Sequence, residues 1–121
     1  MLREVDQVLQ SPGTSRRRWF TDPYFDLIVW QDRDGTVEAF QLSYGKPADE
    51  HALTWQRDRG FGHDRIDDGE GEPGRHKSSP ILVADGAFPR DAIATRFGRE
   101  SAGIDAGIAR FVSAKILEAP G

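Results

Sequence analysis

The chain contains no cysteine, which excludes disulfides, thiolate zinc sites and cysteine nucleophiles. It has no apolar run near the roughly 20 residues that a membrane-spanning helix needs. The first residues, 1–6, carry acids where a secretory signal peptide needs an apolar stretch. We therefore expect a cytosolic protein with no membrane partner.

Catalytic motifs are also missing. The sequence has no Gly-x-Ser-x-Gly elbow, no His-Glu-x-x-His and no Walker loop. Residues 69–74 match the dinucleotide-binding glycine pattern in letters only, because no helix follows to receive a pyrophosphate. The acidic run over residues 64–72 lacks the spacing of a calcium loop. We therefore lean towards a non-enzymatic protein and expect no cofactor and no metal.

Length and charge describe an ordinary soluble domain. The 121 residues suit one domain over 1–121, and 37% hydrophobic residues can supply a core. The net charge of −4 argues against general affinity for nucleic acids or anionic membranes. Glycine, proline and charged residues dominate positions 67–80, which predicts a long, exposed and mobile loop.

Most of the apolar mass lies in residues 24–44, which we interpret as a β-hairpin. β-Branched and aromatic residues fill both arms, and Asp34-Gly35 supplies the turn. A four-residue loop pairs Gln31 with Thr36 and therefore Leu27 with Phe40. This register also pairs Val29 with Glu38, Phe25 with Leu42, Trp30 with Val37 and Tyr24 with Ser43.

The next segment, residues 50–56, extends the hairpin into a meander. Pairing Tyr44 with His51 brings Leu42 onto Leu53 and Phe40 onto Trp55, all on one face. That face should be the core. The opposite face then mixes apolar with polar groups, namely Tyr24, Asp26, Ile28, Trp30, Val37, Ala39, Gln41, Ser43, Thr54 and Gln56.

The rest of the chain adds strands and two helices. Residues 15–21 and 61–66 are expected strands, residues 81–83 a strand or an extended segment, and residues 2–10 either helix or strand. Pro89 suits a helix start, and Ser101 or Asp105 can cap a last helix with an apolar stripe from Ile104 to Ile116. The predicted fold class is α+β, an antiparallel meander of about four to six strands with two C-terminal helices covering one face.

Three groups of residues could carry function. The mixed face offers the interface candidates Tyr24, Asp26, Trp30, Gln41 and Ser43. In the 67–80 loop, Arg75, His76 and Lys77 could bind an anion. Secondary candidates are His51 and His63, on strands that could be neighbours, together with Asp64.

These groups lead to three hypotheses. The first is a non-enzymatic module that uses the mixed face for self-association, as a homodimer, or for binding another protein. The alternative is a small-ligand-binding protein or enzyme with its site between the sheet and the 67–80 loop. The third, weak nucleic-acid binding through Arg16–Phe20, is disfavoured because a strand turns Arg17 away from its neighbours.

Overall fold

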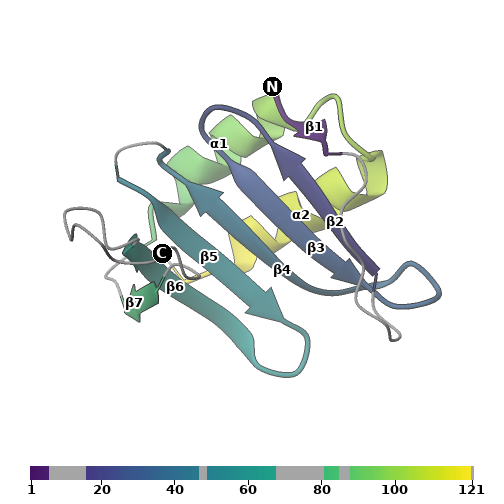
Figure 1. Ribbon diagram of the computed structural model, residues 1–121, viewed down its shortest axis with the longest axis horizontal. Coiled ribbons are helices and arrows are strands. Elements are labelled where there is room, and N and C mark those ends of the chain that lie inside the picture. The colour runs from purple at the N-terminus through teal and green to yellow at the C-terminus, as the bar shows by residue number, and fades with distance from the viewer. Residues whose placement is uncertain (6–15, 47–48, 68–80, 85–87, 121) are drawn as a thin grey trace, which may run out of the picture.

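A computed structural model describes residues 1–5, 16–46, 49–67, 81–84 and 88–120. Over these residues the strands are β1 (Arg3–Glu4), β2 (Arg16–Thr21), β3 (Asp26–Gln31), β4 (Val37–Tyr44), β5 (His51–Gln56), β6 (Gly60–Asp67) and β7 (Ile81–Ala84). They form one antiparallel sheet in the order β1-β2-β3-β4-β5-β6-β7 (Figure 1). The two helices that follow are α1 (Arg90–Glu100) and α2 (Ala106–Glu118).

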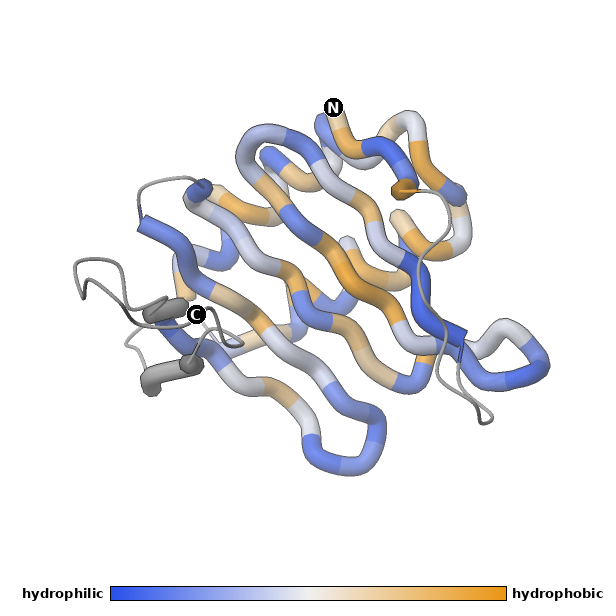
Figure 2. The backbone as a smooth tube through the Cα atoms, in the orientation of Figure 1, coloured by the Kyte–Doolittle hydropathy of each residue, from blue (hydrophilic) through white to orange (hydrophobic). Residues whose placement is uncertain are grey.

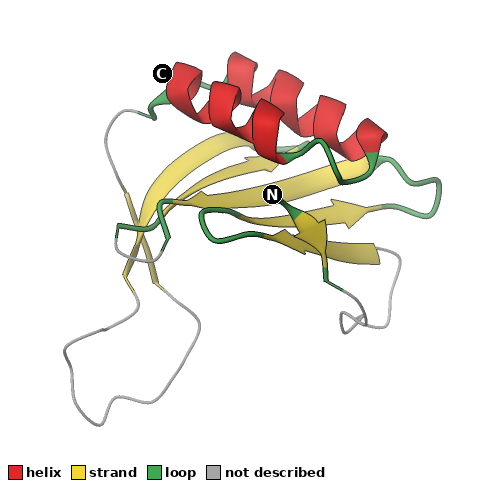
Figure 3. Cartoon of the chain, turned by 90° about the horizontal axis from the view of Figure 1, so that it is seen from above, coloured by secondary structure: helices red, strands yellow, loops and turns green. Residues whose placement is uncertain are grey.

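Both helices lie on the same face of the sheet (Figure 3). Their inward stripes consist of Ile93 and Phe97 from α1 and Ile108, Val112 and Ile116 from α2, all buried. These side chains pack against buried apolar residues of the strands. The most hydrophobic stretches of the sheet lie in the middle of its central strands (Figure 2). The predicted α+β meander with two C-terminal helices on one face is thus confirmed.

The pairing of β4 with β5 matches the prediction residue by residue. Tyr44 is opposite His51, Leu42 opposite Leu53 and Phe40 opposite Trp55. The rings of Phe40 and Trp55 stack at 6.0 Å between centroids, and Trp55 meets Phe111 of α2 at 5.3 Å. The predicted inner face is therefore the core.

The predicted pairing of β3 with β4 is wrong by two residues. Leu27 pairs with Leu42 and Val29 with Phe40, whereas Gln31 pairs with Val37. The turn closes on Asp32 and Thr36, because the Asp32 N–H donates to the Thr36 carbonyl, so Thr36 no longer pairs with Gln31 and the register moves by one residue. A bulge at Trp30/Gln31 adds the second residue.

The shift at the turn and the shift at the bulge together leave most residues of β3 and β4 on the face that was predicted for them. Only the residues between the turn and the bulge change face. Each shift turns the strand over, so two together leave Leu27, Phe40 and Leu42 facing the core. Val37 lies between the two irregularities and is buried in the core, only 7% exposed. Its predicted place on the mixed face is therefore wrong.

The N-terminal segment joins the edge of the sheet. Arg3 and Glu4 pair with Thr21 and Phe20, and the Val5 N–H donates to the Trp19 carbonyl. Leu2 is buried in the core. Of the two alternatives for residues 2–10, the strand is correct over Arg3–Glu4, while residues 6–15 lie outside the described residues.

Helix boundaries follow the capping chemistry. The Asp105 side chain accepts hydrogen bonds from the N–H groups of Gly107 and Ile108, and this carboxylate caps α2. Pro89 occupies the N-cap of α1 and not its first turn. Neither helix is long and apolar enough to cross a membrane, as far as the described residues extend.

Candidate functional site

The strand registers assign every second residue to the face opposite the helices. On β2 to β6 the residues that share this face with Ile28 and Trp30 form what we call the open face: Arg17, Trp19, Thr21, Asp26, Ile28, Trp30, Ala39, Gln41, Ser43, Ala52, Thr54, Gln56, Gly60, Gly62 and Asp64. No described helix or strand packs over it (Figures 1 and 3).

Aromatic side chains are concentrated at one side of the open face. Trp19 on β2 is 39% exposed, and it pairs with the partly exposed Ile28 on β3. Trp30, two residues further along β3, is also partly exposed. Two tryptophans and an isoleucine at adjacent positions on an uncovered sheet form the kind of patch that marks interfaces.

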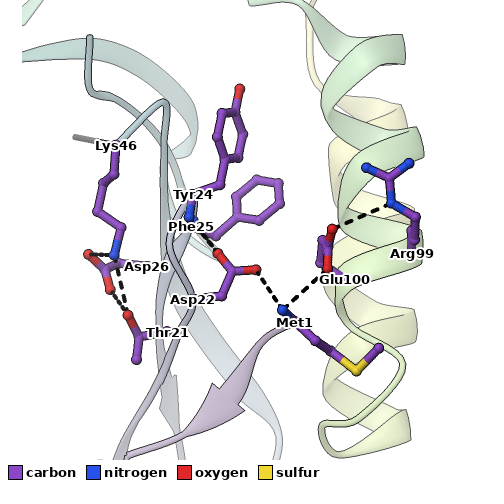
Figure 4. Close-up of polar contacts among 9 residues, drawn as sticks. All are labelled: Met1, Thr21, Asp22, Tyr24, Phe25, Asp26, Lys46, Arg99 and Glu100. Carbon is purple, nitrogen blue, oxygen red and sulfur yellow. Dashed lines mark hydrogen bonds and ion pairs between the residues drawn. The ribbon is translucent and has the colours of Figure 1, made fainter. Parts of the chain in front are cut away.

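A polar network lies beside these aromatic residues. The Asp26 carboxylate accepts hydrogen bonds from the Thr21 hydroxyl at 2.6 Å and from the Trp19 indole N–H at 3.3 Å. The Lys46 ammonium lies 2.9 Å from the same carboxylate (Figure 4). Lys46 thus neutralises Asp26, and the network fixes the orientation of Trp19.

Four of the five predicted interface residues lie on the open face: Asp26, Trp30, Gln41 and Ser43. Ser43 is buried, only 4% exposed, so it contributes little accessible surface. The fifth, Tyr24, was misplaced. Its ring lies beneath the guanidinium of Arg96 from α1 at 3.5 Å and packs against the core, because the chain is not yet a strand before Asp26.

The predicted meeting of two histidines does occur, on the covered face. The rings of His51 and His63 lie 5.8 Å apart and nearly parallel. Tyr44 stacks on both, and its hydroxyl lies 2.5 Å from the Nε2 atom of His63. Phe88 meets His63 and Tyr44, so an aromatic cluster fills this end of the core.

The carboxylates around this cluster differ from the prediction. Asp64 pairs with Ala52 on the open face, so it does not join the histidines. Asp49, which the sequence analysis did not single out, lies 3.2 Å from the Nε2 atom of His51. Within the described ranges no three His, Cys, Asp or Glu side chains come together so that they could hold a metal ion.

The side chains of the arginine-rich strand β2 are not all available for binding a nucleic acid. Arg18 forms a bidentate ion pair with Glu4 and contacts Asp105 at 3.4 Å. Hydrogen bonding to Glu4 raises the pKa of Arg18, and Arg18 lowers the pKa of Glu4. Phe20 is fully buried. Nucleic-acid binding through Arg16–Phe20 would therefore depend on Arg16, Arg17 and Trp19 alone.

Hollows on the described surface include two that adjoin the sheet and the helices. One adjoins the open face near the β5–β6 turn and is lined by Glu38, Ala39, Gln56, Arg57, Asp58 and Arg59. The other lies between α1 and α2 and has mostly small side chains around it. The predicted anion-binding residues Arg75, His76 and Lys77 lie outside the described residues.

Comparisons with known proteins assign neither a family nor a function to the chain. No protein-family model matches the chain. No curated protein and no solved structure matches it either. Among the described residues, the open face carries the most exposed aromatic side chain, Trp19.

Proposed function

We propose that the protein is a non-enzymatic binding module that associates with a second copy of itself through the open face. The observation that carries this proposal is the position of Trp19, Ile28 and Trp30 on a sheet face that no described element covers. Burying such aromatic side chains away from water supplies the main driving force of association.

The size of the open face suits a reversible dimer. Five strands spaced about 4.8 Å apart and about six residues long, at about 3.3 Å per residue, give roughly 500 Å² in projection. Because Ser43 and Ala52 on this face are already buried, two such faces would bury at most about 1,000 Å², near the lower bound for a specific interface. We therefore expect a dissociation constant in about the micromolar range.

The charge pattern favours an identical partner over a strongly charged one. Lys46 neutralises Asp26, so the centre of the face has no strong field that would select a charged ligand. Of the other polar groups on the face, Gln41, Thr54 and Gln56 are uncharged and can both donate and accept hydrogen bonds, whereas the charged residues Arg17 and Asp64 lie on the outer strands β2 and β6. Such groups can pair with copies of themselves.

Replacing one tryptophan by a charged residue tests the proposal. Trp30→Glu puts a carboxylate into the contact and should weaken dimerisation by roughly a hundredfold, because the charge would be desolvated without a partner. Leu117→Glu is the matched control, since Leu117 is 58% exposed on α2, away from the open face. Size-exclusion chromatography with light scattering gives the mass of each variant.

The two variants must differ for the proposal to hold. We expect Trp30→Glu to be a folded monomer and Leu117→Glu to keep the mass of the wild type. Equal masses for both variants, with both folded by circular dichroism, would contradict a role for the open face.

A second candidate function rests on the contact between Tyr44 and His63. A phenol hydroxyl beside an imidazole nitrogen is an acid–base pair of the kind that ligand sites and enzymes use. A small-ligand site at this end of the sheet predicts thermal stabilisation by some metabolite or by Mg²⁺, Ca²⁺, Mn²⁺ or Zn²⁺, and loss of that shift in His63→Gln. A screen without any shift would remove this candidate.

A further inference from the structure

The open face can be described as three parallel rows that cross strands β2 to β6. The first row is Arg17, Trp30, Ala39, Gln56 and Gly60, read from β2 to β6. The second is Trp19, Ile28, Gln41, Thr54 and Gly62, and the third is Thr21, Asp26, Ser43, Ala52 and Asp64. β4 lies in the middle of every row.

The first two rows are bulky on β2–β3 and end on a glycine of β6, whereas the third row ends on Asp64. β2 and β3 contribute Trp19, Ile28 and Trp30, whereas β6 contributes Gly60 and Gly62. The hollow lined by Ala39 and Gln56 lies on the small side as well. The face therefore has a ridge along β2–β3 and a depression along β5–β6.

We propose that two copies pack face to face about a two-fold axis parallel to β4, so that the ridge of each copy fills the depression of the other. This arrangement rests on the proposed self-association and specifies its geometry. The axis exchanges β2 with β6 and β3 with β5, so Trp19 of one copy lies over Gly62 of the other. Trp30 correspondingly lies over Gln56 and its hollow.

Packing density decides between this axis and the other in-plane axis. A two-fold axis perpendicular to the strands would place Trp19 against Trp19 and Gly62 close to the glycines of the second copy. The tryptophans would then hold the sheets apart and leave a void along β6, which forfeits dispersion contacts. The axis parallel to β4 avoids both problems. Both axes keep the strands of the two sheets roughly aligned, as face-to-face sheet packing requires, so the packing of the side chains and not the strand angle distinguishes them.

Gly62 adds to the case for a depression at this site. A Cβ atom there would lie 2.9 Å from the Thr54 hydroxyl, and it would also fill the space proposed for the tryptophan. The same hydroxyl lies 3.4 Å from the Gly62 carbonyl. Because Gly62 has no side chain, β6 does not protrude from the open face at this row, whereas β2 protrudes there through Trp19.

Cross-linking between single-cysteine variants tests the axis. Because the natural sequence has no cysteine, the introduced thiols are the only ones that can react. The proposed axis brings Thr21 of one copy opposite Asp64 of the other. Stacked sheets lie about 10 Å apart, too far for a direct disulfide, so a short bifunctional thiol reagent is used. Tagged Thr21→Cys is mixed with untagged Asp64→Cys, and the mixed product is measured on a gel.

A second pair of cysteine variants tests the perpendicular axis. The perpendicular axis would bring Thr21 of one copy opposite Arg17 of the other, so tagged Thr21→Cys is also mixed with Arg17→Cys. We expect at least about a tenfold excess of mixed product for Asp64→Cys over Arg17→Cys. A dimer that cross-links through Arg17→Cys, or through neither pair, would overturn the axis. A wild type that sediments as a monomer would instead remove the self-association itself.

Discussion

At the residue scale, two aspartates four positions apart have opposite roles. Asp22 lies between the sheet and α1, with its side chain 3% exposed, and accepts hydrogen bonds from the N–H groups of Tyr24 and Phe25. Asp26 lies on the other side of the sheet with Thr21 and Lys46 (Figure 4). The sequence analysis named Asp26 as an interface candidate and assigned no role to Asp22.

Removing the Asp22 carboxylate should destabilise the fold. Asp22→Ala leaves the Tyr24 and Phe25 N–H groups without their acceptor, and we expect a loss of about 1–3 kcal/mol in the free energy of unfolding. Urea denaturation measures the loss. Asp22→Asn keeps an acceptor oxygen and should lose less; an Asp22→Ala variant as stable as the wild type would contradict this role.

At the element scale, the accuracy of the prediction depended on how regular each connection is. β4 and β5 join without a bulge, so matching apolar residues sufficed to find their register. β3 and β4 are joined through a turn that closes one residue away from the expected pair and through a bulge, and neither leaves a clear signal in the residue pattern. Val37 and Tyr24 were misplaced because they lie at such irregular positions.

Glycine substitutions should have opposite effects in a helix and in a turn. Gly98 is in the last turns of α1 with open space around its Cβ position, so Gly98→Ala should stabilise by about 0.5–1 kcal/mol. Gly35 has φ of 85° in the β3–β4 turn, so Gly35→Ala should destabilise by about 1 kcal/mol or more. Thermal unfolding compares the pair, and shifts of the same sign would refute the expectation.

The cap of α2 should make stability depend on pH. Hydrogen bonds from the Ile108 and Gly107 N–H groups, together with Arg18, lower the pKa of Asp105 below its ordinary value of 3.8. A lowered folded-state pKa stabilises the protein above the ordinary value, and this contribution is lost as the pH falls through the folded-state pKa.

Two variants distinguish the contribution of the Asp105 charge to stability from the contribution of its capping hydrogen bonds. Asp105→Ala should cost about 1 kcal/mol near neutral pH, the usual value of an N-cap. Asp105→Asn retains a capping oxygen, so its smaller deficit should vanish as the pH falls below 3.8. Urea denaturation at a series of pH values measures both deficits, and a deficit for Asp105→Asn that grows in acid would contradict this assignment.

At the scale of the whole molecule, both described helices cover the same side of the sheet. Apolar alternation and helix periodicity sufficed to predict this layering, because core faces are set by patterns that can be read in the sequence. The cluster of Tyr44, His51 and His63 was predicted in part, because the register placed Tyr44 opposite His51, whereas nothing in the sequence indicated the contact of His63 with Phe88. The ridge and depression of the open face required the registers of all five strands.

Sedimentation velocity of the wild-type chain over a concentration series tests the central claim most directly. The monomer mass is 13.5 kDa. If the open face joins two copies, the weight-average mass should rise towards twice that value as the concentration passes through the micromolar range. A mass that stays at 13.5 kDa up to millimolar concentration would contradict self-association through this face.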